Sequence, residues 1–183
     1  ELRGKSIAVC GDPEARHGIV LTASYPAKRM GVKTGMPIWE AKQHCRDLII
    51  VPASYGKYQK YSGYVREVFN DYTDQVESFG LDEAWLDITG SVGLFGSPVK
   101  IAKEISVRIK RELGITVSIG VSFNKITAKL GSDYKKPDAI TVIEPDTYKQ
   151  IVYPLPVGDL LYVGNATQRK LGSYGIRTIG QLA

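Results

Sequence analysis

Cysteine is scarce in this sequence of 183 residues, and its scarcity argues against two classes of protein. The two cysteines, Cys10 and Cys45, lie 35 positions apart, and neither belongs to a Cys-x-x-Cys pair. This spacing indicates neither a structural zinc site nor a disulfide framework. Unpaired thiols are typical of a reducing compartment, so we expect a cytoplasmic protein.

Long hydrophobic runs are also missing. The longest aliphatic stretch, Leu48 to Val51, ends at Pro52, whereas a membrane-spanning helix needs about 20 consecutive apolar residues. We therefore expect no membrane contact. No stretch is low in complexity and 43% of the residues are hydrophobic, so the composition excludes a disordered or fibrous chain.

Neither sign of charge dominates strongly. The chain has 24 Lys and Arg against 19 Asp and Glu, a net charge of +5 and a pI of about 9.1. This balance gives a modest preference for anionic partners such as nucleic acid.

The first 54 residues show short elements separated by Gly and Pro. Residues 6–10 and 19–23 indicate two strands around a turn near Asp12 and Pro13. Two helices are predicted over residues 24–30 and 37–46, with a strand over 48–51.

From residue 55 on, helix and strand patterns alternate. Tyr58, Tyr61, Val65, Val68 and Tyr72 recur at spacings of three and four, which predicts a helix with one face packed on a sheet. The order that follows is strand, strand, helix, strand, helix, strand. We therefore expect an α+β fold, with a mixed sheet and its helices on one face. The later elements are expected near residues 75–81, 83–88, 101–113, 117–121, 124–135 and 139–143.

The sequence pattern changes beyond Pro154, where frequent glycines predict a tail of short helices. A boundary therefore belongs near residues 144 to 156. Glu1 opens the chain without Met, and Ala183 stops within a helical pattern, so we expect a piece of a longer protein.

Asp82 and Glu83 are the candidate metal ligands. Adjacent residues of a straight strand point to opposite faces, so both acids can serve one site only where the chain turns. Gly80 would allow that turn. Carboxylates at a hairpin crest suit Mg²⁺, although an isolated Asp-Glu pair is more commonly a solvated turn.

The surrounding string distinguishes these possibilities. Ser78-Phe-Gly-Leu-Asp-Glu-Ala-Trp-Leu-Asp-Ile-Thr89 resembles the S-x-D-E-A-(Y/W)-L-D-(V/I)-T signature of Y-family translesion DNA polymerases, the bacterial DNA polymerase IV and ImpB/MucB/SamB group. Residues 1–9, 22–37 and 120–137 are similar to further segments of that family, in the same order. Residues 155–164 and 170–183 look like the entry to its thumb.

The resemblance implies an enzyme that transfers a deoxynucleotide from a dNTP to a primer 3′-OH, with two Mg²⁺ ions. It makes Asp82 and Glu83 metal ligands and catalytic residues. It also makes Tyr25, Lys28 and Lys136 ligands of the triphosphate, with Thr22 close by. These implied site residues include no nucleophile, which fits phosphoryl transfer, because positioning and electrostatics supply much of the catalysis in that reaction.

The same resemblance divides the chain into three parts. Residues 1–54 would form the fingers and an adjoining edge of the palm, residues 55–145 the palm, and residues 146–183 the start of a helix-hairpin-helix thumb. The implied partners are primer-template DNA and dNTP. Whether a sliding clamp binds C-terminal parts of the parent protein stays open.

Several departures from the family pattern are visible. The family's first metal-binding Asp lies on a central palm strand that should precede Glu1, and the little finger should follow Ala183. We therefore expect this chain alone to be inactive. Lys28 stands where Arg is frequent, Gly80 where Ser is common, and Tyr162 where the thumb often has Gly.

Two other functions remain open at this point. A nucleotidyl cyclase also uses paired acids on Mg²⁺ in a palm-like sheet, although the basic, glycine-rich tail argues against it. A non-catalytic DNA-binding module would keep the fold and the basic surface.

Overall fold

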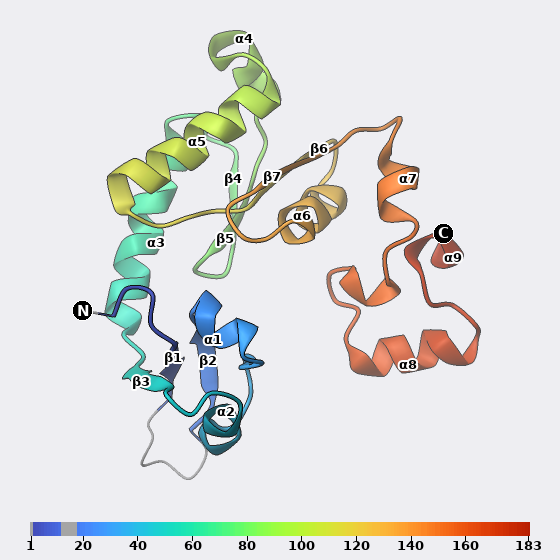
Figure 1. Cartoon of the computed structure of the whole chain (residues 1–183). Helices are drawn as coiled ribbons and strands as arrows, with labels where there is room; N and C mark the ends of the chain where they lie inside the picture. The colour runs from blue at the N-terminus through green and yellow to red at the C-terminus, as the bar shows by residue number, and fades with distance from the viewer. Residues whose placement is uncertain (1, 12–17) are drawn as a thin grey trace. The chain divides into compact units, whose positions relative to one another are not determined.

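The computed structural model describes residues 2–11 and 18–183, and the chain forms two compact units, Glu1–Tyr58 and Gln59–Ala183. Each unit has a hydrophobic core of its own. Both combine helices with short strands (Figure 1), which confirms the predicted α+β class. The turn predicted near Asp12 and Pro13 lies outside the described residues.

The N-terminal unit contains a three-stranded sheet in the order β2-β1-β3. Strand β1 (Ile7–Cys10) pairs antiparallel with β2 (Val20–Ala23) and parallel with β3 (Ile49–Pro52). Helices α1 (Tyr25–Arg29) and α2 (Ile38–His44) complete the unit. All five elements lie where the sequence predicts them.

Small apolar side chains fill this unit's core, and both cysteines belong to it. Cys10 and Cys45 are buried free thiols, and burial raises the pKa of Cys10.

The second unit confirms the order of elements predicted from residue 55 on. A 3₁₀ turn and a short helix are added between its second strand and the following helix. The elements are α3 (Tyr55–Asn70), β4 (Val76–Phe79), β5 (Glu83–Leu86), η1 (Thr89–Ser91), α4 (Val92–Phe95), α5 (Pro98–Leu113), β6 (Ile119–Ser122), α6 (Lys125–Tyr134) and β7 (Ile140–Ile143).

The strands of this unit form two separate pairs rather than the single mixed sheet that the sequence suggests. β4 and β5 pair antiparallel, whereas β6 and β7 pair parallel. Within the described residues, no strand hydrogen-bonds to both pairs, so each ladder ends after two strands. The described strands of this unit thus include both antiparallel and parallel pairing, divided between two ladders.

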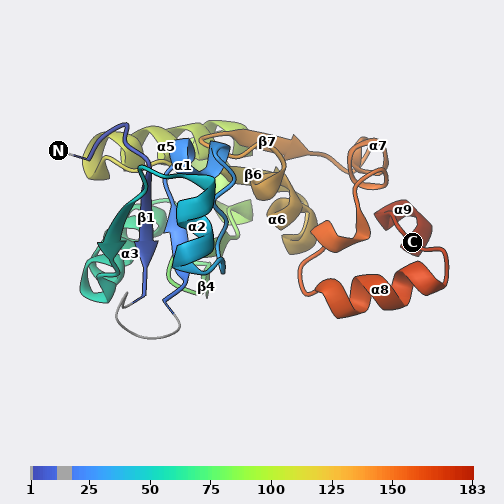
Figure 2. The ribbon, with the colours of Figure 1, turned by 60° about the horizontal axis from the view of Figure 1, so that its bottom comes forward.

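The helices of this unit also do not share one face. Ile119 of β6 packs into the core formed by α3 and α5. The next residue, Gly120, points to the other side, because successive strand residues alternate. There, a Cβ would clash with the backbone of α6. Helices α5 and α6 thus lie on opposite sides of β6 and β7 (Figure 2), and the one-face prediction is wrong.

Helix α3 buries only part of the apolar stripe that its sequence predicts. Val68 and Tyr72 are buried against Ile101, Ile105 and Ile109, but Tyr58 and Tyr61 are exposed. The α5 isoleucines contact the C-terminal part of α3 and do not cover the earlier tyrosines.

The tail forms short helices, as predicted. Val152 and Ile179 share a core with Leu130 of α6 and Ile143 of β7, so apolar contacts continue across residue 146. The division into fingers, palm and thumb stays a prediction. The tail elements are α7 (Tyr148–Val152), η2 (Val157–Asp159), α8 (Asn165–Ser173) and α9 (Ile179–Leu182).

Across residues 2–11 and 18–183, no helix combines the length and apolarity needed to cross a membrane.

The loop between β4 and β5 depends on a glycine. The register places Phe79 opposite Glu83, which leaves Gly80, Leu81 and Asp82 to turn the chain. Gly80 has a φ of +72°, a left-handed conformation that costs other L-residues about 1 kcal/mol or more.

We predict that Gly80→Ala lowers the free energy of unfolding by about 1 kcal/mol, because the backbone there is left-handed. A Cβ at Gly80 meets nothing within 4 Å, so no steric clash adds to this cost. The matched control is Gly63→Ala inside α3, where a Cβ also meets nothing. This control should stabilise the protein by up to about 1 kcal/mol. Urea unfolding measures both, and equal shifts in the two variants would contradict the prediction.

Candidate active site

The acid pair lies at the tip of the β4–β5 hairpin. Asp82 is the last loop residue and is exposed, whereas Glu83 begins β5 and its side chain is 34% exposed. The expectation that the chain turns at these two acids is confirmed.

The hairpin tip is tied to helix α3. The Nη2 of Arg66 donates to the carbonyl oxygen of Gly80 at 2.8 Å. Just below the tip, the rings of Phe79 and Trp85 pack with centroids 5.1 Å apart. The Arg66 hydrogen bond thus holds the loop that carries the acids, and the aromatic contact holds the two strands next to it.

One face of the hairpin meets helix α6. The indole Nε1 of Trp85 donates to the carbonyl oxygen of Lys125 at 3.1 Å. The ammonium of Lys125 lies over the Trp85 ring and pairs with the carboxylate of Glu77. The register pairs Glu77 with Trp85, so these three residues form one contact between helix and hairpin.

One turn further along α6, a lysine contacts Glu83, the second of the two acids. The Nζ of Lys129 lies 2.9 Å from Oε1 of Glu83 and 2.9 Å from Oδ2 of Asp133. Asp133 Oδ1 in turn pairs with Nζ of Lys136 at 2.5 Å. Glu83, Lys129, Asp133 and Lys136 therefore form a chain of alternating charges, here called the charge chain.

The pKa values within the charge chain reflect these pairings. Burial alone would lower the pKa of Lys129, but hydrogen bonds to Asp133 and Glu83 outweigh burial and raise it. Burial alone would raise the pKa of Asp133, but hydrogen bonds from Lys136 and Lys129 outweigh burial and lower it. Both groups are therefore charged at neutral pH.

The position of α6 is fixed at its N-terminus. Asn124 is the N-cap, and its Oδ1 accepts from the backbone N–H of Thr127 at 2.9 Å. The hydroxyls of Thr127 and Ser122 are 2.7 Å apart, and Ser122 also donates to the carbonyl oxygen of Ile143. These bonds join α6 to both β6 and β7.

Two glycines let α6 approach the strands closely. A Cβ at Gly120 would clash with the carbonyl oxygen of Ala128 and lie 2.6 Å from the backbone nitrogen of Ser132. Gly131 faces Gly120 across this contact, with its own Cβ position 3.1 Å from the Gly120 Cα. The backbone of α6 thus packs directly on the backbone of β6, and this contact sets the distance between the helix and the strands.

The other predicted site residues lie in the N-terminal unit. Thr22 is an exposed residue of β2, and Tyr25 and Lys28 lie on α1. The Nζ of Lys28 is 5.5 Å from the centroid of the Tyr25 ring, so these two side chains are brought together. The start of α1 is fixed by Ser24, whose hydroxyl accepts from the backbone N–H of Ile7.

The carboxylates at the hairpin tip can be compared with the ligand set that a divalent metal needs. No group of three or more His, Cys, Asp or Glu that could hold a metal ion occurs in residues 2–11 and 18–183. Mg²⁺ commonly takes one or two carboxylates and completes its octahedron with water and substrate phosphates. Asp82 and Glu83 therefore fit an ion shared with a substrate better than an ion held by protein alone.

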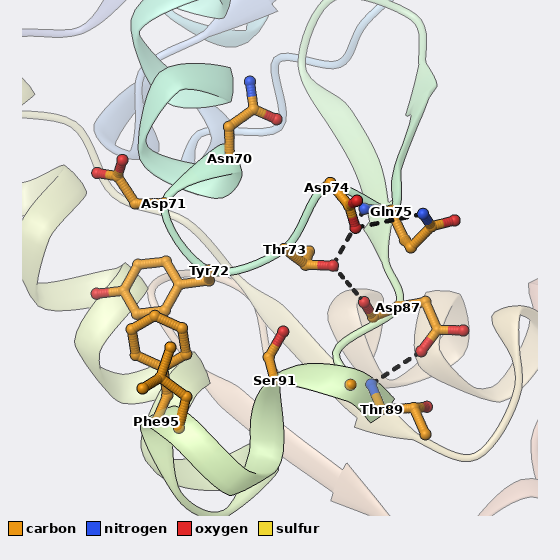
Figure 3. A pocket seen from close by; sticks show the side chains of 12 residues that line it. Asn70, Asp71, Tyr72, Thr73, Asp74, Gln75, Asp87, Thr89, Ser91 and Phe95 are labelled. Carbon is orange, nitrogen blue, oxygen red and sulfur yellow. Dashed lines mark hydrogen bonds between the residues drawn. The ribbon is translucent and has the colours of Figure 1, made fainter.

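A cavity of about 470 Å³ lies at the other end of the hairpin (Figure 3). Thr73 Oγ1 donates to the carbonyl oxygen of Asp87 there, and Asp87 Oδ1 accepts from the N–H of Thr89. Hydrogen bonds from Thr89 lower the pKa of Asp87. Asp87 lies four positions after Glu83, about 13 Å along an extended chain, so it belongs to the base of the hairpin and not to its tip.

Tyr162 in the tail explains one departure from the family pattern. Its φ of +69° falls in the left-handed region, where glycine is favoured. The Tyr162 ring packs edge-on against Phe79, with centroids 6.4 Å apart. The ring therefore gains a contact with the hairpin that a glycine would lack.

Sequence reasoning missed the roles of Lys125, Lys129 and Asp133. The spacing of Lys129 and Asp133, four residues apart on a helix, was a usable signal for a pair on one face. No pattern in the sequence indicated that Glu83, 46 residues earlier, would join them.

These features define the class: a mixed α+β chain that presents two carboxylates on a β-hairpin, with a lysine-bearing helix against them. The chain belongs to the impB/mucB/samB family, whose model matches residues 1–133. The resemblance that the sequence motifs carry is thereby confirmed.

Two relatives illustrate the similarity. The DNA polymerase IV of Acetivibrio thermocellus is 57% identical over 183 residues, which is 100% of this chain and 46% of that protein. DNA polymerase IV 1 of Bacillus subtilis is 43% identical over 182 residues, 100% of this chain and 44% of that protein. The chain thus spans about half the length of the curated relatives it matches.

Solved structures give the same result. The insertion ternary complex of Dbh DNA polymerase is 34% identical with a TM-score of 0.89, and the match covers 97% of this chain and 52% of that one. DinB from Sulfolobus solfataricus is 34% identical with a TM-score of 0.87, again covering 97% of this chain and 52% of that one.

We predict that Gly120→Ala lowers the free energy of unfolding by at least about 2 kcal/mol, because the new methyl group meets the backbone of α6 and the helix must shift. Gly172→Ala in α8, where a Cβ meets nothing within 4 Å, is the control and should not destabilise the protein. Urea unfolding compares the two. A Gly120→Ala protein as stable as its parent would show that α6 does not pack this closely.

Proposed function

We propose that this chain is the catalytic core portion of a cytoplasmic DNA polymerase for lesion bypass, which transfers deoxynucleotides from dNTPs to a primer 3′-OH. The observation that carries the proposal is the pair Asp82 and Glu83 at a hairpin tip braced by lysines of α6. Similarity to proteins named DNA polymerase IV, and to Dbh polymerase in an insertion ternary complex, supports this function over a nucleotidyl cyclase.

A DNA polymerase family implies the use of divalent metal. We propose that the metal is Mg²⁺, that two ions take part, and that Asp82 and Glu83 are ligands. Such ions stabilise the negative charge that develops on the phosphates and on the attacking oxygen. A further carboxylate from a preceding strand would complete the set, since the described residues offer no cluster of three.

The triphosphate of the incoming nucleotide would be bound by cationic and hydroxyl groups. We assign this role to Lys28 and Lys136, with Tyr25 and Thr22 as neutral donors. Charge grows on the leaving pyrophosphate during the reaction, so the two ammonium groups would stabilise the transition state more than the ground state. The contact between Lys28 and Tyr25 supports a joint role for these two.

Primer-template DNA is the proposed partner. The short helices of the tail suit contacts from backbone N–H groups to phosphates, which do not read sequence. Such binding should weaken as salt concentration rises.

The first test removes a proposed metal ligand from the full-length protein that contains this chain. Asp82→Ala should reduce template-directed primer extension by at least about 100-fold, because the metal loses a carboxylate ligand. Binding to primer-template DNA, measured by fluorescence anisotropy, should be retained. The control is Asp146→Asn, an exposed acid outside the hairpin, which should leave extension unchanged.

The same variants separate the competing functions. Extension that survives Asp82→Ala would reject the site assignment. Cyclic nucleotide formation in place of extension would indicate a cyclase. DNA binding by the parent protein without either activity would indicate a non-catalytic module.

The second test concerns the 183-residue chain by itself. We predict no template-dependent incorporation in a primer-extension assay, because a metal-binding carboxylate and much of the DNA-binding surface would be missing. Incorporation that depends on template and is lost in Asp82→Ala would contradict this prediction.

A further inference from the structure

Lys129 differs from every other cation that forms an ion pair in the described residues. Its side chain is 16% exposed, the lowest value among these cations. Exposed ion pairs contribute little because water and salt screen them, whereas an ammonium this shielded from water interacts more strongly with its partners. Its ammonium also contacts two carboxylates, at 2.9 Å each.

The fit between α6 and the hairpin explains why Lys129 reaches Glu83. Four residues along a helix rise about 6 Å, and two residues along a strand rise about 6.6 Å. Lys125 and Lys129 are four residues apart, and their partners on β5, Trp85 and Glu83, are two residues apart. The two elements therefore match in spacing, and the second lysine falls on the metal ligand.

We propose that Lys129 is a positioning residue that serves as an internal counter-cation for Glu83. Its ammonium holds the carboxylate through Oε1 while no metal is bound, and a divalent cation would have to approach against its positive charge. This inference rests on the proposed function, since it takes Glu83 to be a metal ligand.

The consequence is that metal binding is conditional. An ammonium on Oε1 repels a divalent cation that approaches the same carboxylate, and it offsets part of the negative charge that attracts the cation. A nucleotide triphosphate brings further oxygen ligands and negative charge, which offset that repulsion. Lys129 thus makes the carboxylates a poor site for free metal and a better one for metal that arrives with a nucleotide.

Asp133 gives Lys129 a second partner. If Glu83 moved to bind a metal, the ammonium of Lys129 would keep its contact with Asp133 Oδ2. The lysine would then lose one partner rather than both and would not be left unpaired. Asp133 also contacts Lys136, so the shift would be felt at the proposed triphosphate ligand.

The experiment measures binding of Mn²⁺ alone, without nucleotide or DNA, by electron paramagnetic resonance of the full-length protein. Lys129→Met should tighten Mn²⁺ binding by about 10-fold or more, because a competing charge is removed. In the presence of dATP, the difference from the parent should shrink to less than about 3-fold, since triphosphate oxygens then share the ion.

Two controls separate the charge of Lys129 from its packing. Lys125→Met removes a lysine that also bridges α6 and the hairpin but contacts Glu77 instead, and it should leave Mn²⁺ affinity unchanged. Lys129→Arg keeps the positive charge and should bind Mn²⁺ as weakly as the parent. Thermal unfolding of each variant verifies folding, and Lys129→Gln replaces Lys129→Met if the latter does not fold.

The outcomes distinguish this inference from the proposed function. Unchanged or weaker Mn²⁺ binding by Lys129→Met, with binding abolished in Glu83→Gln, overturns the counter-cation role but leaves the metal site standing. Mn²⁺ binding that is indifferent to Glu83→Gln overturns the metal site and this inference with it. Tighter binding in Lys129→Met but not in Lys125→Met or Lys129→Arg supports both.

Discussion

The close contact between α6 and the β6–β7 pair is the constraint on which the candidate site depends. Gly120 and Gly131 bring the backbones of strand and helix together, and no side chain there can adjust the distance. Asn124 fixes where the helix begins. The distance of α6 from the strands and the residue at which it begins are therefore both determined. As a result, Lys125 and Lys129 reach the hairpin at the spacing of Trp85 and Glu83.

Electrostatics then connects groups that lie far apart in the sequence. Glu83, Lys129, Asp133 and Lys136 alternate in charge, and each charge has a partner. Such an arrangement lowers the cost of keeping Lys129 largely shielded from water, since a lone buried ammonium would tend to lose its proton. The acid pair is therefore part of a set of charges, and its response to a cation depends on the whole set.

The helices and strands could be predicted well from the sequence, because hydrophobic periodicity and chain breaks at Gly or Pro depend on local structure. The sequence predicted the turn at Asp82 and Glu83 for the same reason, through Gly80. It did not predict which face of β6 would receive α6, since this depends on Gly120 meeting Gly131, a contact between two residues without side chains. Nor did it predict the exposed tyrosines of α3, because the reach of the α5 isoleucines is a tertiary property. Family resemblance supplied Lys136 as a site residue, but not Lys129, which only the ion pair with Glu83 identifies.

The tether from Arg66 to the hairpin loop ends on a main-chain oxygen, the carbonyl of Gly80. A main-chain acceptor is present whatever amino acid occupies the neighbouring loop positions. Evolution can therefore vary the side chain at Leu81, at the crest of the loop, without losing the hydrogen bond that holds the loop to α3. The anchor therefore does not depend on the side chain at Leu81, which is free to vary between Gly80 and Asp82.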